Sequence, residues 1–275
     1  MFIFLLFQVR KLRVVKPINH GAKISSLGRP NEHQRWFWDP LRESGLHDLI
    51  YLGYATVPHA LLMTLCERWH PETSSFHMVL GEMIVTLDDV TCLMHLQIDG
   101  RMLSHEKKML KHEGVALLMK HLGVSQQDTE KIAEKEYGGY ISYPKLRQLY
   151  TRYLDRANRL ADPEDPRDEE ELQKVRTFCV KCYLLYLIGY LLFGDRSNKR
   201  IELVYLTIME EGYAGMRNYS WGGMTLTYLY GELAEACKPG DRALGGKRDT
   251  AHCKKLINVN LNFYSFVIFF ARKNL

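Results

Sequence analysis

A chain of 275 residues is long enough for one large folded domain or two smaller ones. Its apolar share of 46% and charged share of 25% are ordinary for a globular protein and exclude wholesale disorder. The net charge of +5 lies at the ends: residues 1–35 hold seven Lys/Arg and one acid, residues 247–275 hold six and one, and residues 36–246 are acidic overall. A nucleic-acid-binding domain usually concentrates positive charge on its folded body, so this distribution argues against a polyanion-binding core.

The cysteines and the terminal apolar runs indicate the cellular compartment of the protein. Six cysteines in mostly apolar helical patterns predict buried, reduced thiols and a cytosolic or nuclear protein. The apolar runs Phe2–Phe7 and Leu261–Ala271 fall short of the roughly 20 residues that span a bilayer, so we expect no membrane partner.

The first predicted elements are two helices. Asp39-Pro40 opens a short helix that Gly45 interrupts. Pro58 suits the first turn of a second helix, because a missing N–H costs nothing there. Apolar residues then recur at helical spacing up to Trp69, and Pro71 ends this helix.

A hairpin and a capped helix follow. The β-favouring runs Phe76–Val79 and Met83–Thr86 flank Leu80-Gly81-Glu82, which predicts a small hairpin near 76–86. Thr86 and Asp89, three residues apart, have the spacing of a capping box, so we expect a helix from here through Leu96.

The middle of the chain predicts three more helices. One has its apolar face between Val115 and Leu122 and ends at Gly123, and Ser125 with Asp128 forms a second capping box for the next. Pro144 begins the third. The stretch at about 161–169, with two prolines and several acids, predicts a solvated linker.

The helix predicted from about Glu170 to Phe193 is the most informative element. No residue between Lys181 and Asp195 is charged, so this half is apolar all round and belongs in the middle of a bundle. A further helix is predicted at Ile201–Met209, and Ser220 is expected to cap a helix from Trp221 to Cys237. The expected fold is therefore mainly α, a multi-helix bundle with one small β-hairpin near 76–86.

Four sequence blocks in order resemble the plant mobile domain family, from about Trp36 to Gly246. They are LCERWHPETSSFH at 65–77, GEMIVTLDDV at 81–90, YLLYLIGYLLF at 183–193, and YSWG at 219–222 with LYGEL at 229–233. The chain departs from the family pattern at His95–Gly100, which lacks a glycine and a proline. Lys247–Leu275 also lacks the usual Trp-containing helical region and suggests a truncated end.

The basic charge of residues 1–35 predicts a disordered leader, the resemblance implies a helical domain at 36–246, and residues 247–275 are expected to be an aberrant or disordered tail. The resemblance further implies mobile-element ancestry, nuclear localisation, and links to gene expression, transposon silencing and meristem maintenance. The implied partners are proteins, among them a Ser/Thr phosphatase-like protein. We expect structural roles for the motif residues Glu67, Arg68, Trp69, Thr73, Phe76, His77, Gly81, Glu82, Thr86, Asp89, Trp221 and Gly222.

The family's aminotransferase-like label finds no catalytic motif in these residues. Pyridoxal-phosphate chemistry needs a Schiff-base lysine and a phosphate-binding turn, and no lysine has a recognisable setting. Cys179 and Cys182 have CxxC spacing, with Cys237, His252 and Cys253 as further candidate zinc ligands, but core thiols are the better interpretation. The glycines and the lysine of Gly240–Arg248 do not have the spacing of a phosphate-binding loop. We expect no catalytic, cofactor or metal site.

The sequence therefore predicts a non-enzymatic nuclear interaction module. The alternative is a transposon-derived DNA-binding domain, with nucleic acid contacted through the basic N-terminal arm. An enzyme ranks third and requires a pocket with convergent polar groups around His70, His77 and Glu82.

Overall fold

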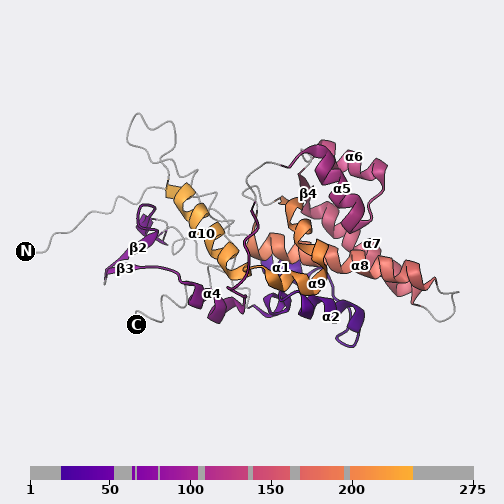
Figure 1. Ribbon diagram of the computed structural model, residues 1–275, viewed down its shortest axis with the longest axis horizontal. Helices are drawn as coiled ribbons and strands as arrows, with labels where there is room; N and C mark the ends of the chain where they lie inside the picture. The colour runs from indigo at the N-terminus through magenta and orange to yellow at the C-terminus, as the bar shows by residue number, and fades with distance from the viewer. Residues whose placement is uncertain are drawn as a thin grey trace, which may run out of the picture.

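The computed structural model describes residues 20–52, 64–65, 67–79, 81–104, 109–135, 139–161, 168–194 and 199–237. Most of the predicted leader, the tail and most of the linker lie outside these residues. The fold is mainly α with a small β-hairpin, as predicted (Figure 1). The helical elements are α1 His20–Ser25, α2 Arg35–Glu43, η1 His47–Tyr51, α4 Leu87–Met94, α5 Lys111–Leu122, α6 Gln126–Lys135, α7 Tyr143–Leu160, α8 Glu169–Leu187, η2 Ile188–Leu192, η3 Leu203–Glu211, α9 Gly212–Gly215, η4 Met216–Asn218 and α10 Trp221–Cys237.

The helix α8 and its π-helical extension η2 form the centre of the core. Every residue from Cys182 to Phe193 is buried, and α2, α5 and α7 pack around α8 (Figure 1). Within the described residues, only Glu169–Leu192 is a helical segment long and apolar enough to cross a membrane. Because 78% of its most apolar window is buried inside the fold, it has the environment of a core helix.

Three short strands form an antiparallel sheet at one end of the molecule. They are β1 Trp69–His70, β2 Ser75–Met78 and β3 Gly81–Met83, in the order β1-β2-β3. The predicted hairpin is present, but its turn comes earlier than expected: Gly81 and Glu82 pair with Met78 and His77 instead of forming the turn. Gly81 has φ +128°, a backbone conformation that favours glycine.

A second sheet was not predicted. β4 Tyr140–Ser142 pairs with β5 Arg200–Glu202, and Ile141 and Ile201 face each other, fully buried. The helix predicted at Ile201–Met209 was therefore wrong at its start, and η3 continues from Leu203 as a 3₁₀ helix. A short apolar run does not distinguish strand from helix, and the pairing partner lies about 60 residues away in the sequence.

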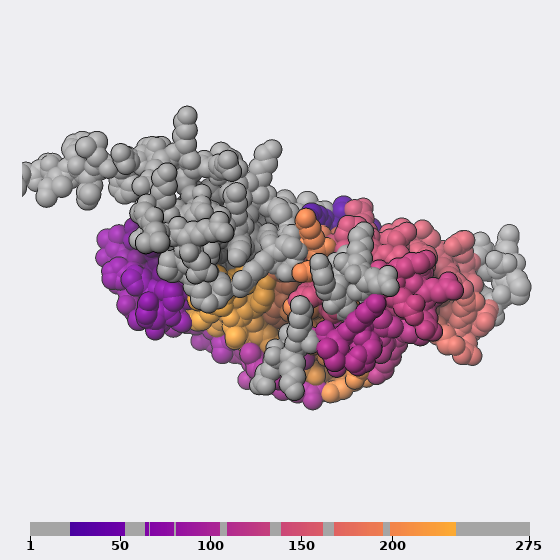
Figure 2. All heavy atoms as spheres, turned by 90° about the horizontal axis from the view of Figure 1, so that it is seen from above, coloured from indigo at the N-terminus to yellow at the C-terminus, as the bar shows by residue number. Residues whose placement is uncertain are grey.

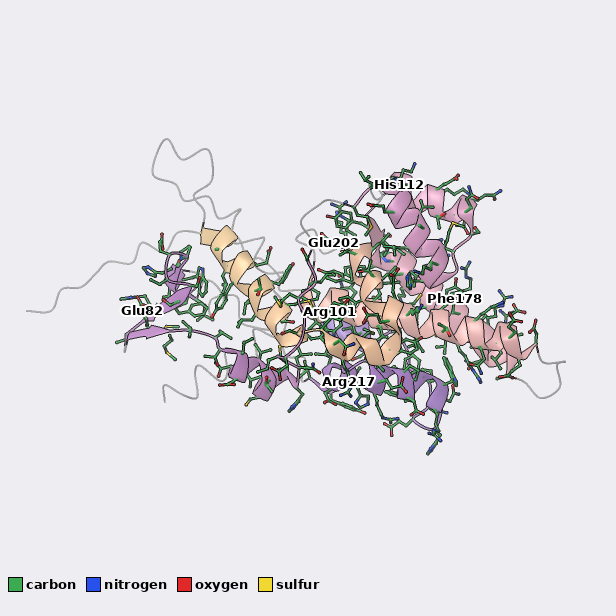
Figure 3. The ribbon with its side chains drawn as sticks, in the orientation of Figure 1. Glu82, Arg101, His112, Phe178, Glu202 and Arg217 are labelled. Atoms are coloured by element: carbon green, nitrogen blue, oxygen red, sulfur yellow. The ribbon has the colours of Figure 1, made fainter. Side chains whose placement is uncertain are left out.

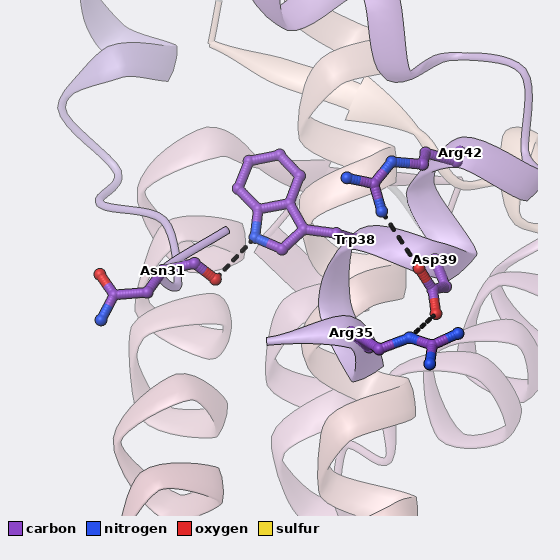
Figure 4. Close-up of polar contacts among 5 residues, drawn as sticks. All are labelled: Asn31, Arg35, Trp38, Asp39 and Arg42. Carbon is purple, nitrogen blue, oxygen red and sulfur yellow. Dashed lines mark hydrogen bonds and ion pairs between the residues drawn. The ribbon is translucent and has the colours of Figure 1, made fainter. Parts of the chain in front are cut away.

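The helix α2 begins four residues earlier than predicted and contains Pro40. Its first turn is held from both sides (Figure 4): Trp38 Nε1 donates to the Asn31 carbonyl at 2.9 Å. Asp39 accepts from Arg35 at 3.0 Å and from Arg42 at 3.1 Å. These contacts and the buried side chains of α2 allow Pro40 inside the helix although it lacks an N–H.

Several predicted helix ends are confirmed, although α4 ends at Met94, two residues before the predicted Leu96. Gly123 ends α5 in the left-handed conformation, with φ 60°. The Asp168 carboxylate accepts from Glu171 N at 3.0 Å and starts α8, and Ser220 Oγ accepts from Gly223 N at 3.2 Å and starts α10. The helix predicted up to Trp69 is described only in part, and Trp69 itself lies in β1.

The cysteines match the prediction in part. Cys179 and Cys182 are buried free thiols, and burial raises the pKa of both, that of Cys182 well above its ordinary value. Cys92 is exposed, contrary to the expectation of buried thiols, because it lies on the outer side of α4. The side chains of Cys66, Cys237 and Cys253 lie outside the described residues.

Candidate interaction face at the signature blocks

The first signature block builds one corner of the core around Trp69. This side chain is 4% exposed, and its ring lies 4.9 Å from Phe76 and 5.1 Å from Tyr230 of α10, centroid to centroid. The Tyr230 hydroxyl donates to the Val85 carbonyl at 2.6 Å. Sheet, following loop and α10 are thus held together by one aromatic cluster.

The loop between β1 and β2 is fixed by hydroxyl groups. The Thr73 and Ser75 hydroxyls lie 2.7 Å apart, and Ser75 is buried. Ser74 has φ 51°, an uncommon conformation for a residue other than glycine. Arg68 donates to the His77 carbonyl at 3.1 Å. The signature arginine therefore braces the backbone of β2.

The second block supplies a reciprocal cap for α4. Asp89 N donates to Thr86 Oγ1 at 3.1 Å, and Thr86 N donates to Asp89 Oδ2 at 2.9 Å. The Thr86 hydroxyl also donates to the same carboxylate at 2.8 Å. The predicted capping box is present, and it fixes the direction of α4 immediately after the sheet.

The YSWG block fastens α10 to the segment that leaves α4. Trp221 is 1% exposed and its Nε1 donates to the Met216 carbonyl at 2.9 Å, while Gly222 N donates to the Gln97 carbonyl at 2.8 Å. A Cβ at Gly222 would lie 2.8 Å from Ile98 Cγ2, so the close approach requires glycine. The Ser220 hydroxyl donates to the Ile98 carbonyl.

Two arginines near the middle of the molecule connect this junction to neighbouring elements (Figure 3). Arg217 donates to the carbonyls of Arg42 and Glu43 at 2.8 and 2.9 Å, and so satisfies the C-terminal end of α2. Gln97 Nε2 donates to the Arg217 carbonyl at 2.6 Å. Arg101 pairs with Glu211 and lies over the Tyr219 ring at 4.4 Å.

The other half of the signature points outward. Glu67, Thr73, His77 and Glu82 are exposed, and Glu82 projects at the end of the molecule opposite α7 and α8 (Figure 3). Three apolar side chains beside them are also exposed: Val79 at 91%, Ile84 at 52% and Leu87 at 40%. We call the set His70, His77, Val79, Glu82, Ile84 and Leu87 the signature face. Its strands lie at one end of the surface, beside α10 (Figure 2).

The polar side chains of the signature face are not arranged as in a site for acid–base catalysis. The His70 and His77 rings lie 5.4 Å apart. Within the described residues, neither ring hydrogen-bonds to Glu67, Glu72 or Glu82, and all five side chains are exposed. General acid–base catalysis requires groups within hydrogen-bond reach of each other or of a bound substrate, and this arrangement favours surface contacts instead.

A buried polar cluster elsewhere was missed by the sequence interpretation. His121 of α5 is 2% exposed, and Lys181 Nζ of α8 lies 3.2 Å from its Nδ1. With the ammonium donating, the neutral ring carries its proton on Nε2, which lies 3.5 Å from Glu210 Oε1 of η3. Glu210 also pairs with Lys120 at 2.8 Å. The only sequence indication was Lys181 at the edge of an uncharged run.

Burial and the neighbouring charges shift the pKa values of the groups in this cluster. Burial, followed by the Lys181 ammonium, lowers the pKa of His121. Burial also lowers the pKa of Lys181, and the hydrogen bond from Lys120 lowers the pKa of Glu210. Among the described residues, no group of three or more His, Cys, Asp or Glu side chains is arranged to hold a metal ion.

Comparison with known proteins identifies the lineage of these blocks. A phosphatase relative, the serine/threonine-protein phosphatase 7 long form homolog of Arabidopsis thaliana, is 30% identical over 74% of this chain and 14% of its own length. Protein MAIN-LIKE 1 of the same plant is 31% identical over 67% of this chain and 33% of its own length. Protein MAINTENANCE OF MERISTEMS is 23% identical over 77% and 40%.

The chain thus covers only 14 to 40% of these relatives. No solved structure matches it. The family model for the plant mobile domain matches residues 45–261, a range that starts after Trp36 and runs past Gly246, so our domain bounds stay a prediction. Since this range is most of the chain and contains all four signature blocks, the protein belongs to the plant mobile domain family.

Proposed function

We propose that this chain is a non-enzymatic nuclear protein-interaction module of mobile-element ancestry, linked to gene expression, transposon silencing and meristem maintenance. One observation carries the proposal: the signature blocks are two-sided. Trp69 and Phe76 build the core, while Val79, Ile84 and Leu87 leave apolar surface on the same short segment. Exposed apolar side chains rimmed by polar groups are typical of protein interaction sites.

The absence of a held acid–base pair supports a binding role over catalysis. On the described part of the signature face, the histidines and carboxylates are exposed and make no hydrogen bonds to one another. Such side chains suit the polar rim of an interface. The nuclear and meristem-linked role rests on the relatives named MAINTENANCE OF MERISTEMS and MAIN-LIKE.

The partner we propose is a Ser/Thr phosphatase-like protein. The support is the phosphatase-named relative, in which a region similar to this chain makes up only 14% of the length. Interfaces between domains of one chain resemble transient protein–protein interfaces, so a surface that contacts a phosphatase domain within one chain is suited to contact a separate phosphatase chain.

The test is a tagged pull-down from nuclease-treated nuclear extract, read for the phosphatase-like protein. The variant Val79→Ser/Ile84→Ser removes exposed apolar contact from the signature face. The matched control Leu110→Ser/Met119→Ser removes exposed apolar side chains beside and on α5, where they are 58% and 42% exposed. We expect the face variant to lose the phosphatase-like protein and the control to retain it. Equal recovery of the phosphatase-like protein with both variants would contradict the proposal. So would a parent protein that recovers it from untreated extract but not from nuclease-treated extract.

A further inference from the structure

The helix α7 carries an unusual concentration of positive charge. Its 18 residues include five basic side chains and one acid, Asp155, although residues 36–246 are acidic overall. Four of the basic residues are exposed and the fifth is half-buried. We call this set the α7 basic face: Lys145, Arg147, Arg152, Arg156 and Arg159.

The positions of these residues place most of them on one side of the helix. At about 100° per residue, Lys145, Arg152, Arg156 and Arg159 fall within an arc of roughly 60°. Arg147 lies on the far edge of the exposed side, and polar Gln148, Thr151 and Asn158 lie between. From residue 145 to 159 the helix rises about 21 Å, which matches about six base pairs of duplex.

Most of this charge has no acidic partner among the residues that the structure describes. Arg156 pairs with Glu171, but no described residue forms an ion pair with Lys145, Arg147, Arg152 or Arg159. Lys145 contacts Gln148, and Arg152 lies over the Tyr153 ring at 5.1 Å. Basic side chains on an exposed face without neutralising acids favour a polyanionic partner.

Three of the four acids that begin α8 are engaged by other groups of α8. Asp168 caps α8, Glu170 pairs with Lys174 at 2.5 Å, and Glu169 accepts from Gln173 at 2.9 Å. Only Glu171 reaches across to α7.

A loop from the N-terminal side packs against α7. The Tyr150 hydroxyl donates to the Gly28 carbonyl at 2.8 Å and Arg147 donates to the Ser26 carbonyl at 3.3 Å, which anchors the 26–29 loop on α7. The end of α7 and the start of α8 lie at the end of the molecule opposite the signature face (Figure 1), so the two surfaces are well separated.

We propose that the α7 basic face binds the phosphate backbone of nucleic acid, as a second binding surface that is independent of the signature face. The contacts would be made by Lys and Arg side chains to phosphate oxygens, with Gln, Thr and Asn donors between them. Such contacts carry no base preference, so binding is salt-dependent and sequence-independent.

The experiment measures binding of the full chain to dye-labelled nucleic acid by fluorescence anisotropy across a salt series. A 20-base-pair DNA duplex and a single-stranded RNA of the same length are separate arms, which tell the two sources of phosphate apart. The test variant is Lys145→Gln/Arg152→Gln/Arg159→Gln. The matched control, Arg35→Gln/Lys111→Gln/Lys131→Gln, makes the same change in net charge on α2, α5 and α6, and Arg42 keeps its ion pair with Asp39.

We expect the test variant to flatten the slope of log K against log salt by about 2 to 3, since each duplex phosphate contact contributes about 0.9. Its Kd at low salt should rise about tenfold or more, and the control should stay within about twofold of the parent. Asp155→Asn should tighten binding. The proposal is overturned if the parent binds neither nucleic acid at low salt. It is also overturned if the control loses as much affinity as the test variant, or if only neutralising Arg10, Lys11, Arg13 and Lys16 of the N-terminal arm weakens binding.

Discussion

The rings of Trp69 and Tyr230 pack 5.1 Å apart, and this contact joins the first signature block to the last helix. Trp69 also faces Phe76 across the β1–β2 pair. The signature blocks therefore fold together into one packed unit. In this unit the sheet, α4 and α10 pack against one another. The exposed side chains of the same blocks are positioned by that unit.

Replacing Trp69 with alanine tests this packing. We expect Trp69→Ala to lower the free energy of unfolding by about 3–5 kcal/mol, because a large buried aromatic leaves a cavity. Val79→Ala, at a side chain that is 91% exposed, should change it by less than about 0.5 kcal/mol. Urea unfolding followed by circular dichroism measures both. A Trp69→Ala loss below about 1 kcal/mol would mean that the aromatic cluster does not hold the unit together.

Two glycines on α10 should respond to alanine in opposite directions. At Gly222 a Cβ would lie 2.8 Å from Ile98, so Gly222→Ala should destabilise by about 1–3 kcal/mol. At exposed Gly231 a Cβ would meet nothing within 4 Å, so Gly231→Ala should stabilise the helix by about 0.5–1 kcal/mol. Thermal unfolding of the pair gives the signs. The same sign for both would disprove the close approach of α10 to Gln97 and Ile98.

The cap of α4 offers a smaller, local effect. Thr86→Ala removes the hydroxyl that accepts from Asp89 N and should destabilise by about 1 kcal/mol. Thr86→Ser retains the hydroxyl and should recover most of the loss. Chemical denaturation compares the three proteins, and equal stability of the alanine and serine variants would show that the cap contributes nothing.

The buried cluster around His121 predicts a dependence of stability on pH. Burial and the Lys181 ammonium lower the pKa of His121 in the fold below its ordinary value of 6.5, so the unfolded chain binds the proton first. The contribution of His121 to stability is present above pH 6.5 and is lost as the pH falls from 6.5 through the lowered pKa. Lys120 and Glu210 also face the ring, and Glu210, whose pKa is lowered from 4.5, titrates in a more acidic window.

Urea unfolding between about pH 5 and 8 measures this dependence. His121→Gln should remove most of it. Lys181→Met should narrow the window, because the neighbouring ammonium no longer opposes protonation of the ring. A parent protein whose stability does not fall between pH 6.5 and 5 would contradict the cluster as described.

Local sequence chemistry predicted much of the fold. The start of α10 at Ser220 and the span of α8 could be predicted because caps and an unbroken apolar pattern mark them. The β4–β5 pair could not, since Ile141 and Ile201 meet only in three dimensions. Pro40 misled the prediction of α2, because side-chain contacts to Asn31 and Asp39 outweigh the local preference.

The candidate site was predictable in its residues but not in its layout. The sequence marked Trp69 for the core and capped α4 at Thr86, but not which signature residues face solvent. The His121 cluster draws on α5, α8 and η3, so no spacing along the chain reveals it. The charge of α7 was hidden by the acidity of the surrounding domain.

The most direct test of the two-sided signature is photo-crosslinking from defined positions in plant nuclei. A benzoyl-phenylalanine replaces Val79 on the signature face in one protein and Met119 on α5, which is 42% exposed, in the other. The account predicts that crosslinking from position 79 captures a Ser/Thr phosphatase-like protein in nuclease-treated samples, and that position 119 does not. Capture from 119 alone, or from neither position while the partner still co-purifies, would contradict the claim that this face is the interaction surface.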